Sequence, residues 1–249
     1  MTISYHTTAL GHRIAYQHQP GSAPGVLFCC GFRSDMESTK ATALAEWCAQ
    51  CGVAFTRFDY FGHGKSDGDF KEFTIGGAIT DALEVLDFIA MGDQILVGSS
   101  MGGWIALHAA LERKHQVVGL VGVAAAPDFT EKLMFPRMMP EQRAQLEEEG
   151  LIWAHSDYFN NDYPITRHFI HEARNHLLMD DGIVLEKPVH LIHGQQDADV
   201  PWETSLQLSA KLMSDEVTIT LIKDGDHRLN RPSDLAWLME AVRKMLNAI

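Results

Sequence analysis

The stretch of this 249-residue chain that constrains its fold most is QILVGSSMGGWIALHA, residues 94–109. An apolar run ends at GSSMG, and an alanine-rich pattern typical of a helix follows at once. A strand, a sharp turn and a helix in this order are the context in which G-x-S-x-G forms a nucleophile elbow. Side chains at the glycine positions would crowd the strained central serine, so Gly98 and Gly102 select Ser100 rather than Ser99. The pattern predicts that Ser100 is a nucleophile; the alternative is a plain glycine-rich turn.

A serine hydroxyl is a weak nucleophile at neutral pH, and it needs a base that is itself oriented by an acid. With this type of elbow, the acid and then the histidine follow the serine along the chain. An apolar strand at 189–192 runs into the loop HGQQDADVP, where Asp197 is the predicted acid. Asp199 is interpreted as solvated or as a cap of the helix near Trp202. Asp128, which follows a strand at 117–123, is a second possible position for the acid.

The predicted base is His227, and its position identifies it, because the chain has 13 histidines and residue type alone says little. A strand at 217–222 is followed by the polar loop KDGDH before the last predicted helix. This order places His227 after the acid and at the same sheet edge as Ser100. His193, which follows its strand directly, is expected to have a structural role in the acid loop.

Acyl transfer also needs two amide donors for the oxygen on which negative charge develops. One should be the amide of Met101, next to the nucleophile and at the positive end of the following helix. The other should come from the loop after an early strand at 26–30. Gly31 lets the backbone turn toward the site there, so the amide of Phe32 is the predicted second donor.

Strands and helices alternate along most of the chain, which predicts a parallel sheet with helices on both faces. The glycine-rich loop at 62–68 lacks the spacing of a phosphate-binding loop and is interpreted as a tight crossover. The alternation stops between Ala126 and Lys187, where about sixty residues are too many for a simple connection. We therefore expect one domain over residues 1–249, with residues 127–187 inserted as a cap over Ser100. Methionines between 134 and 139 suit an adaptable acyl-binding wall, although packing of the cap would also explain them.

Five stretches give the chain a resemblance to the α/β-hydrolases along nearly its whole length. They are RFDY at 57–60, GKSDG at 64–68, the elbow with its helix, HGQQDADVPW from residue 193, and DHR at 226–228. Within that superfamily the chain resembles the branch of palmitoyl-protein thioesterases and mycophenolic-acid acyl-glucuronide esterases. The resemblance implies an α/β-hydrolase fold with a mostly parallel central sheet. It also implies hydrolysis of fatty-acyl thioesters or acyl-glucuronide esters.

The expected mechanism is a Ser100–Asp197–His227 triad that passes through an acyl-enzyme and requires neither metal nor organic cofactor. Small-molecule or acylated-peptide esters and thioesters are the expected partners. The same triad would also suit a lactonase, a peptidase or a carbon–carbon bond hydrolase. A non-catalytic binding protein that keeps this fold is a further alternative.

Composition narrows the classes of partner. The net charge of −13 argues against nucleic acid and against an anionic membrane surface. No run approaches the roughly 18 apolar residues of a membrane span, and the N-terminal stretch lacks the pattern of a signal peptide, so residence in the cytoplasm is expected. The four cysteines all lie within the first 51 residues and do not form a disulfide framework; packing explains them best. The oligomeric state is left open.

Overall fold

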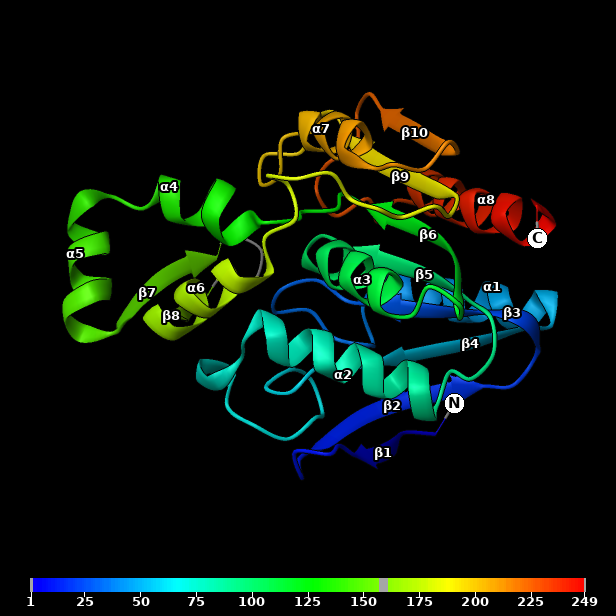
Figure 1. Cartoon of the computed structure of the whole chain (residues 1–249), viewed down its shortest axis with the longest axis horizontal. Coiled ribbons are helices and arrows are strands. Elements are labelled where there is room, and N and C mark those ends of the chain that lie inside the picture. Colours follow the sequence, from blue (N-terminus) through cyan, green and yellow to red (C-terminus); the bar gives the residue numbers. More distant parts are fainter. Residues whose placement is uncertain (1, 157–160, 249) are drawn as a thin grey trace.

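A twisted sheet of eight strands forms the centre of the protein (Figure 1). The computed structural model describes residues 2–156 and 161–248. The strands are β1 (Ser4–Thr7), β2 (Arg13–Gln19), β3 (Ser22–Cys29), β4 (Val53–Phe58), β5 (Gln94–Ser99), β6 (Val117–Val123), β9 (Val189–Gly194) and β10 (Val217–Ile222). Their order is β1-β2-β4-β3-β5-β6-β9-β10. Pairing is antiparallel at β1-β2-β4 and parallel from β4 to β10, which confirms the expected mostly parallel sheet.

Helices cover both faces of the sheet, as the alternating pattern predicts. They are α1 (Thr39–Cys51), α2 (Ile75–Phe88), α3 (Met101–Glu112), α7 (Glu203–Lys211) and α8 (Pro232–Ala248). In Figure 1, α2, α3 and α7 lie in front of the sheet and α1 and α8 lie behind it. Local signals set their ends: Thr74 accepts a hydrogen bond from the amide of Gly77 at the start of α2, and Gly52 ends α1 with a φ of 71°.

The middle of the sheet is the most deeply buried part of the molecule. All six residues of β5 are buried, and so are the last five of β3. Continuous apolar strands are typical of a parallel sheet that is covered on both faces. Helix α3 is also apolar on nearly every side, because it packs between the sheet, α2 and the segment that follows β6. The elbow therefore joins two of the most deeply buried elements of the fold.

The long segment between β6 and β9 forms a separate layer beyond the carboxyl ends of the parallel strands (Figure 1). It contains η2 (Thr130–Met134), α4 (Phe135–Arg137), α5 (Pro140–Glu149), β7 (Leu151–Ser156), β8 (Asn161–Thr166), α6 (Arg167–Ala173) and η3 (Arg174–His176). Strands β7 and β8 pair with each other in antiparallel fashion, apart from the main sheet. The short helical turn η1 (Phe70–Glu72) contacts β8 and α6 from the body of the molecule.

Hydrogen bonds join this inserted segment to the body and its two ends to each other. The indole of Trp104 in α3 donates to the carbonyl of His176 at 2.9 Å. The carboxylate of Asp128 accepts the amides of Leu178 and Met179 at 2.9 and 2.8 Å, and the Asp128 side chain is fully buried. The bonds of Asp128 to Leu178 and Met179 thus connect the beginning of the inserted segment to its final part. Its interpretation as a cap with the boundaries 127–187 stays a prediction.

Helix α3 approaches β3 so closely that Gly102 cannot carry a side chain. A Cβ at this position would overlap the carbonyl oxygens of Cys29 and Cys30. We expect Gly102→Ala to lower the free energy of unfolding by about 3 kcal/mol or more, because backbone atoms cannot move aside as a flexible side chain can. Urea denaturation measures this loss.

Gly182→Ala is the matched control. A Cβ there would come no nearer than 3.8 Å to the Met213 side chain, at an exposed position where φ is negative. Its midpoint should stay within experimental error of the parent protein. Equal midpoints for both variants would contradict the close approach of α3 to β3.

Candidate active site

Ser100 occupies a strained turn between β5 and α3. Its backbone angles are φ 54° and ψ −120°, which a residue with a side chain seldom adopts. Backbone hydrogen bonds to the end of β6 and the residues after it hold the turn. The Ser100 amide donates to the carbonyl of Val123 at 2.9 Å, and the Ser100 carbonyl accepts from the amide of Ala126 at 3.1 Å. This geometry raises the serine hydroxyl above the carboxyl edge of the sheet, as the elbow pattern predicts.

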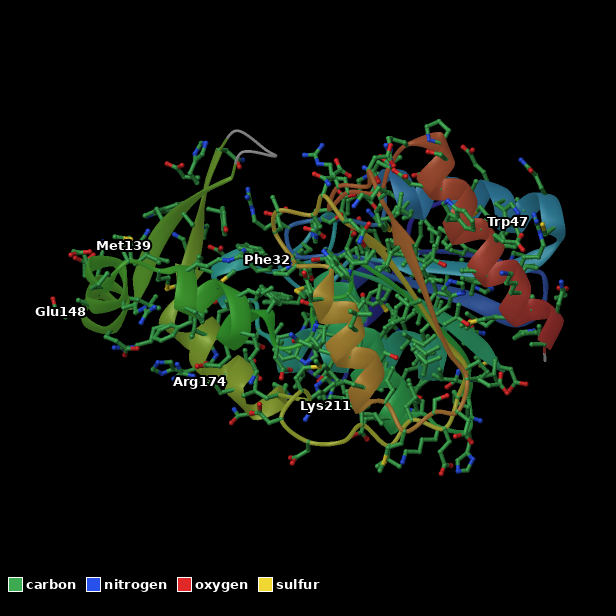
Figure 2. All side chains as sticks on the ribbon, turned by 90° about the horizontal axis from the view of Figure 1, so that it is seen from above. Phe32, Trp47, Met139, Glu148, Arg174 and Lys211 are labelled. Carbon is green, nitrogen blue, oxygen red and sulfur yellow. The ribbon has the colours of Figure 1, made fainter. Side chains whose placement is uncertain are left out.

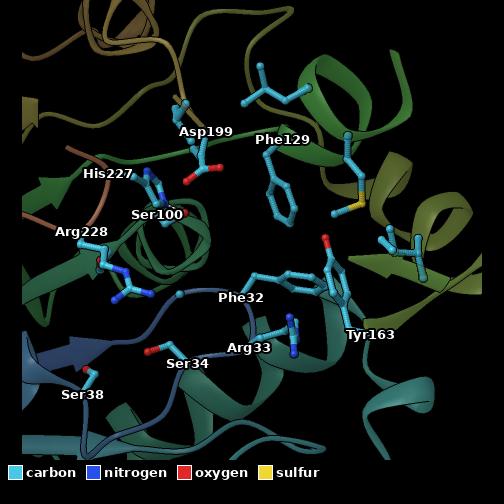
Figure 3. Close-up of a pocket in the computed structure, with 18 of the residues that line it drawn as sticks. Phe32, Arg33, Ser34, Ser38, Ser100, Phe129, Tyr163, Asp199, His227 and Arg228 are labelled. Carbon is cyan, nitrogen blue, oxygen red and sulfur yellow. Dashed lines mark hydrogen bonds between the residues drawn. The ribbon is translucent and has the colours of Figure 1, made fainter. Parts of the chain in front are cut away.

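His227 lies between the hydroxyl of Ser100 and the carboxylate of Asp197 (Figure 3). Its Nδ1 is 2.7 Å from Asp197 Oδ2, and its Nε2 is 3.1 Å from Ser100 Oγ. Because the carboxylate can only accept, the imidazole carries its hydrogen on Nδ1 and donates it to Asp197. Nε2 is then the acceptor for the Ser100 hydroxyl. The three predicted residues, far apart in sequence, are brought into one hydrogen-bonded chain.

The carboxylate of Asp197 is fully buried and accepts four hydrogen bonds. Besides His227, these come from Nε2 of His193 at 3.1 Å and from the amides of Asp199 and Val200 at 2.9 and 2.8 Å. Burial by itself would raise the pKa of Asp197, but the hydrogen bonds from the two histidines outweigh it and hold the pKa well below its usual range. Asp197 is therefore ionised at neutral pH.

His193 has the structural role in the acid loop that its position predicts. Its Nε2 lies 3.1 Å from Asp197 Oδ2 and 3.0 Å from the carbonyl oxygen of Val200, and both of these atoms are acceptors. Nε2 must therefore carry the hydrogen. Nδ1 then accepts from the hydroxyl of Ser205 in α7 at 2.7 Å. His193 thus fixes the acid loop to the helix that follows it.

The two other carboxylates that the sequence offered have different surroundings. Asp128 accepts the amides at the end of the inserted segment, at 2.9 and 2.8 Å. The side chain of Asp199 lines the cavity near His227 (Figure 3). The interpretation of Asp199 as a helix cap is wrong, because α7 has Trp202 at its N-cap position and no side chain caps it. The acid loop bends Asp199 away from that helix end by binding its amide to Asp197.

The loop after β3 passes directly beside the elbow. A Cβ on Gly31 would lie 3.2 Å from the carbonyl oxygen of Ser99 and 3.4 Å from Cβ of Ser100. The next residue is Phe32, and Met101 follows the serine. Neither of these two amides donates a hydrogen bond to the backbone or side chains described in residues 2–156 and 161–248. Both are therefore available as donors beside Ser100.

Sequence reasoning missed His63, which supports this loop from below. Its Nε2 accepts the backbone amide of Arg33 at 3.2 Å, and Arg33 has a φ of 58°. Burial lowers the pKa of His63 to about 4, so the ring is neutral at physiological pH and Nε2 keeps its lone pair. The signal is the loop FGHGKSD at 61–67, which periodicity alone marks only as a crossover.

The ring of Phe32 packs within an aromatic cluster at the boundary of body and inserted segment. It stacks on the ring of Phe169 in α6, with the two ring centroids 5.3 Å apart. The centroids of four further rings lie 5.2–6.2 Å from that of Phe32, those of Phe70, Phe73, Phe129 and Tyr163. Aromatic pairs of this kind fix the position of a side chain more firmly than aliphatic contacts do. The cluster therefore ties the loop that carries the Phe32 amide to the inserted segment.

A cavity of about 560 Å³ opens above Ser100 and His227. The inserted segment supplies much of its apolar wall, with Leu133, Met134, Met138, Ile152 and Ile165. Met139 is exposed, in contrast to the expectation that the neighbouring methionines share one wall. Figure 2 shows Met139 at the outer edge of the segment and Phe32 where the segment meets the body. The turn at the start of α5 directs Met138 inward and Met139 outward.

Asp197, Asp199 and His227 offer ligand atoms within 4.8 Å of one another, which is close enough for a metal site. The donor set does not suit an ion, however. Both oxygens of Asp197 already accept N–H groups, and Nδ1 of His227 is one of the donors. The cluster is arranged to orient an imidazole.

Comparison with known proteins gives consistent results. A family model described as serine aminopeptidase, S33 (Hydrolase_4) matches residues 23–158. Palmitoyl-protein thioesterase ABHD10, mitochondrial, from Homo sapiens is 38% identical over 238 residues, which cover 95% of this chain and 77% of that protein. The protein of the same name from Mus musculus is 38% identical and is covered to 80%.

Solved structures agree with the fold. Alpha/beta hydrolase domain-containing protein 10 from mouse has a TM-score of 0.92 at 37% identity, covering 100% of this chain and 99% of that one. A putative hydrolase from Agrobacterium vitis S4 has a TM-score of 0.93 at 38% identity, covering 98% and 99%. A structure of Est1E from Butyrivibrio proteoclasticus with bound ferulic acid has a TM-score of 0.82 at 23% identity, covering 98% of each chain, which shows the shared fold alone.

Within residues 2–156 and 161–248, no helix is both long and apolar enough to cross a membrane. The two palmitoyl-protein thioesterases named above are described as mitochondrial, so the expectation of a cytoplasmic protein finds no support in them and stays a prediction. Identity over nearly the whole chain, and not the elbow alone, decides the classification. The chain belongs to the serine aminopeptidase S33 family of α/β-hydrolases, within the group related to palmitoyl-protein thioesterase ABHD10, and is an enzyme that hydrolyses ester bonds.

Proposed function

We propose that this enzyme cleaves carboxylic esters and thioesters of the fatty-acyl or acyl-glucuronide type through Ser100, His227 and Asp197. The observation on which this rests is the chain of hydrogen bonds at 2.7 and 3.1 Å that joins the three side chains. The relatives named as palmitoyl-protein thioesterases support the substrate class. A non-catalytic binding protein would have no need of this geometry.

The reaction has two steps. His227 Nε2 takes the hydroxyl proton as Ser100 Oγ attacks the carbonyl carbon, and Asp197 stabilises the imidazolium that forms. The amides of Phe32 and Met101 bind the oxyanion of the tetrahedral intermediate. His227 then gives the proton to the departing alcohol or thiol, which leaves an acyl-enzyme. Water repeats the sequence, so that a carboxylic acid is released and Ser100 is regenerated.

In this proposal, residues 127–187 act as a cap that covers the acyl group. Leu133, Met134 and Met138 line the apolar side of the cavity, and the aromatic cluster around Phe32 closes it toward the body. An acyl chain is held there by burial of its methylene groups, each of which contributes about 0.8 kcal/mol. The body supplies the chemistry and the cap supplies the selectivity for the acyl chain.

A peptidase that binds the free amino terminus of its substrate is less well supported by the cavity. A positively charged amino terminus needs a carboxylate near the nucleophile. Among the described residues that line the cavity, Asp199 is the one carboxylate, whereas Arg33, Lys40, Arg137 and Arg228 are cationic. This charge distribution favours ester substrates with neutral or anionic groups.

The decisive experiment is hydrolysis of p-nitrophenyl acyl esters combined with fluorophosphonate labelling. Ser100→Ala should abolish both turnover and labelling, while Ser99→Ala keeps them. Asp197→Asn should lower kcat by about 10⁴, because the amide favours the wrong tautomer of His227. Asp128→Asn, whose side chain is bound elsewhere, is the control and should cost far less. A collapse in Asp128→Asn with Asp197→Asn nearly active would overturn the assignment of the acid.

Met138 and Met139 form a matched pair that tests the cap. Met138→Ala should lower kcat/KM for long acyl esters several-fold relative to short ones, because about 1 kcal/mol of contact with the chain is lost. Met139→Ala should leave this ratio unchanged, since its side chain is 61% exposed and lies outside the cavity. An identical loss on every chain length for Met138→Ala would show that the residue only packs the segment.

Substitutions of His63 test whether it supports the loop that carries the Phe32 amide. His63→Phe fits the surrounding rings of Tyr60, Phe70 and Phe73 but removes the acceptor for the Arg33 amide. We expect kcat to fall about tenfold or more with little change in KM, because the Phe32 amide acts on the transition state. His63→Gln restores an acceptor and should recover part of the rate. Equal losses in both variants, or a change in KM alone, would contradict this role.

A further inference from the structure

The cavity has two sides of different chemistry, and Ser100 lies between them. Figure 3 shows Phe32, Phe129 and Tyr163 on one side of Ser100 and Arg228, Ser34 and Ser38 on the other. Lys40 and Asn230 also belong to the polar side. An ester bound with its acyl chain on the apolar side must direct its alcohol or thiol part toward the polar side.

The polar side is positively charged in a protein that is strongly negative. The chain has a net charge of −13, yet among the described residues four cationic side chains and one carboxylate line the cavity. Two of these cations lie on the cap side: Arg33 lies 4.2 Å from the centre of the Tyr163 ring, and Arg137 of α4 donates to the carbonyl of Asp199. Lys40 and Arg228 form the positive charge on the leaving-group side.

Lys40 lies where a cation is locally unfavourable. It is in the first turn of α1, where the helix dipole disfavours positive charge. Burial lowers its pKa to about 8, and the charge of Arg228 opposes it as well, although Asp226 and Asp234 act in the other direction. Burial and the helix dipole both disfavour a cation at this position, and its presence there points to a role in binding.

The ammonium group of Lys40 is held in place but keeps a donor for a ligand. Nζ donates to the carbonyl of Arg228 at 2.5 Å and to Oδ1 of Asn230 at 3.4 Å. It forms no ion pair with any carboxylate in the part of the chain that the structure describes. Since an ammonium has three hydrogens, one remains for a group in the cavity.

Ser38 provides a second, independent observation. Its hydroxyl oxygen is buried and has no hydrogen-bond partner among the residues described. Ser38 stands at the N-cap position of α1 and still makes no side-chain cap bond. A buried hydroxyl without a partner costs about 1–3 kcal/mol, and a ligand with acceptor oxygens on this side of the cavity would satisfy it.

We propose that Lys40, Arg228 and Ser38 form a leaving-group subsite that binds an anion, so that the enzyme prefers esters and thioesters whose alcohol or thiol part carries a carboxylate or a phosphate. The inference rests on the proposed function of Ser100. The subsite binds oxygen atoms remote from the scissile bond and takes no part in proton transfer. Its effect is to orient the leaving group while His227 protonates it.

The test uses two octanoyl esters that differ only in charge, those of 3-hydroxybenzoate and 3-hydroxybenzamide. The parent enzyme should have a higher kcat/KM for the anionic ester. Lys40→Met and Arg228→Gln should each lower the anionic-to-neutral ratio about tenfold, which is the usual effect of one charge-assisted hydrogen bond. Because the ratio compares two substrates of one protein, partial loss of folded enzyme cancels.

Lys65→Met is the control, since Lys65 is a half-exposed surface cation that pairs with Glu37 and does not line the cavity. It should leave the ratio unchanged. Octanoyl glucuronide and octanoyl phosphopantetheine then distinguish a carboxylate from a phosphate ligand by which of them loses more in Lys40→Met. A parent ratio near one, or a ratio that neither Lys40→Met nor Arg228→Gln changes, would overturn the subsite while leaving the triad in place. Hydrolysis of neither ester, with no labelling of Ser100, would overturn the proposed function and the subsite with it.

Discussion

The buried carboxylate of Asp197 is the interaction on which the arrangement of the site depends. Two backbone amides and two histidines donate to its two oxygens, so its charge is compensated without a cation. A buried carboxylate is stable only when its acceptor sites are filled in this way. The same four bonds fix the path of the acid loop and the tautomer of His227. Loop structure and the basicity of Nε2 therefore have a common cause.

A second constraint acts at the elbow. Gly31, Gly98 and Gly102 let the loop after β3, the end of β5 and the start of α3 meet without side chains between them. The strain at Ser100 and the left-handed turn at Arg33 are maintained by these contacts and by the neutral ring of His63. Rigid strands and the central helix thus hold both amides and the hydroxyl in fixed relative positions before any substrate arrives.

The inserted segment supplies the apolar wall of the cavity. The body offers a row of polar groups at the carboxyl edge of the sheet, and the segment places apolar side chains opposite them. The aromatic cluster around Phe32 joins the two, because it packs the wall of the cavity against the loop beside Ser100. The cavity is therefore apolar on the side of the inserted segment and cationic on the side of the body.

The triad and the sheet could be predicted from the sequence because their signals are local. The elbow pattern, the loop after residue 192 and the loop before the last helix each follow an apolar strand, and parallel strands bring their carboxyl ends to one edge. Ser100, Asp197 and His227 could therefore be assigned to one edge of the sheet from the sequence alone.

Other features depend on contacts between segments far apart in the chain, and only the tertiary structure decided them. Nothing next to His63 in the sequence shows that it accepts the Arg33 amide, 30 residues away. Asp199 looked able to cap a helix, until the hydrogen bond from its amide to Asp197 directed it to the cavity. Met138 and Met139 are neighbours of the same type, and a turn of the backbone buried one and exposed the other. The sequence determined which chemistry the chain can perform, because the reactive groups stand in local patterns; the structure alone decided the cavity around them, because packing across the molecule has no local pattern.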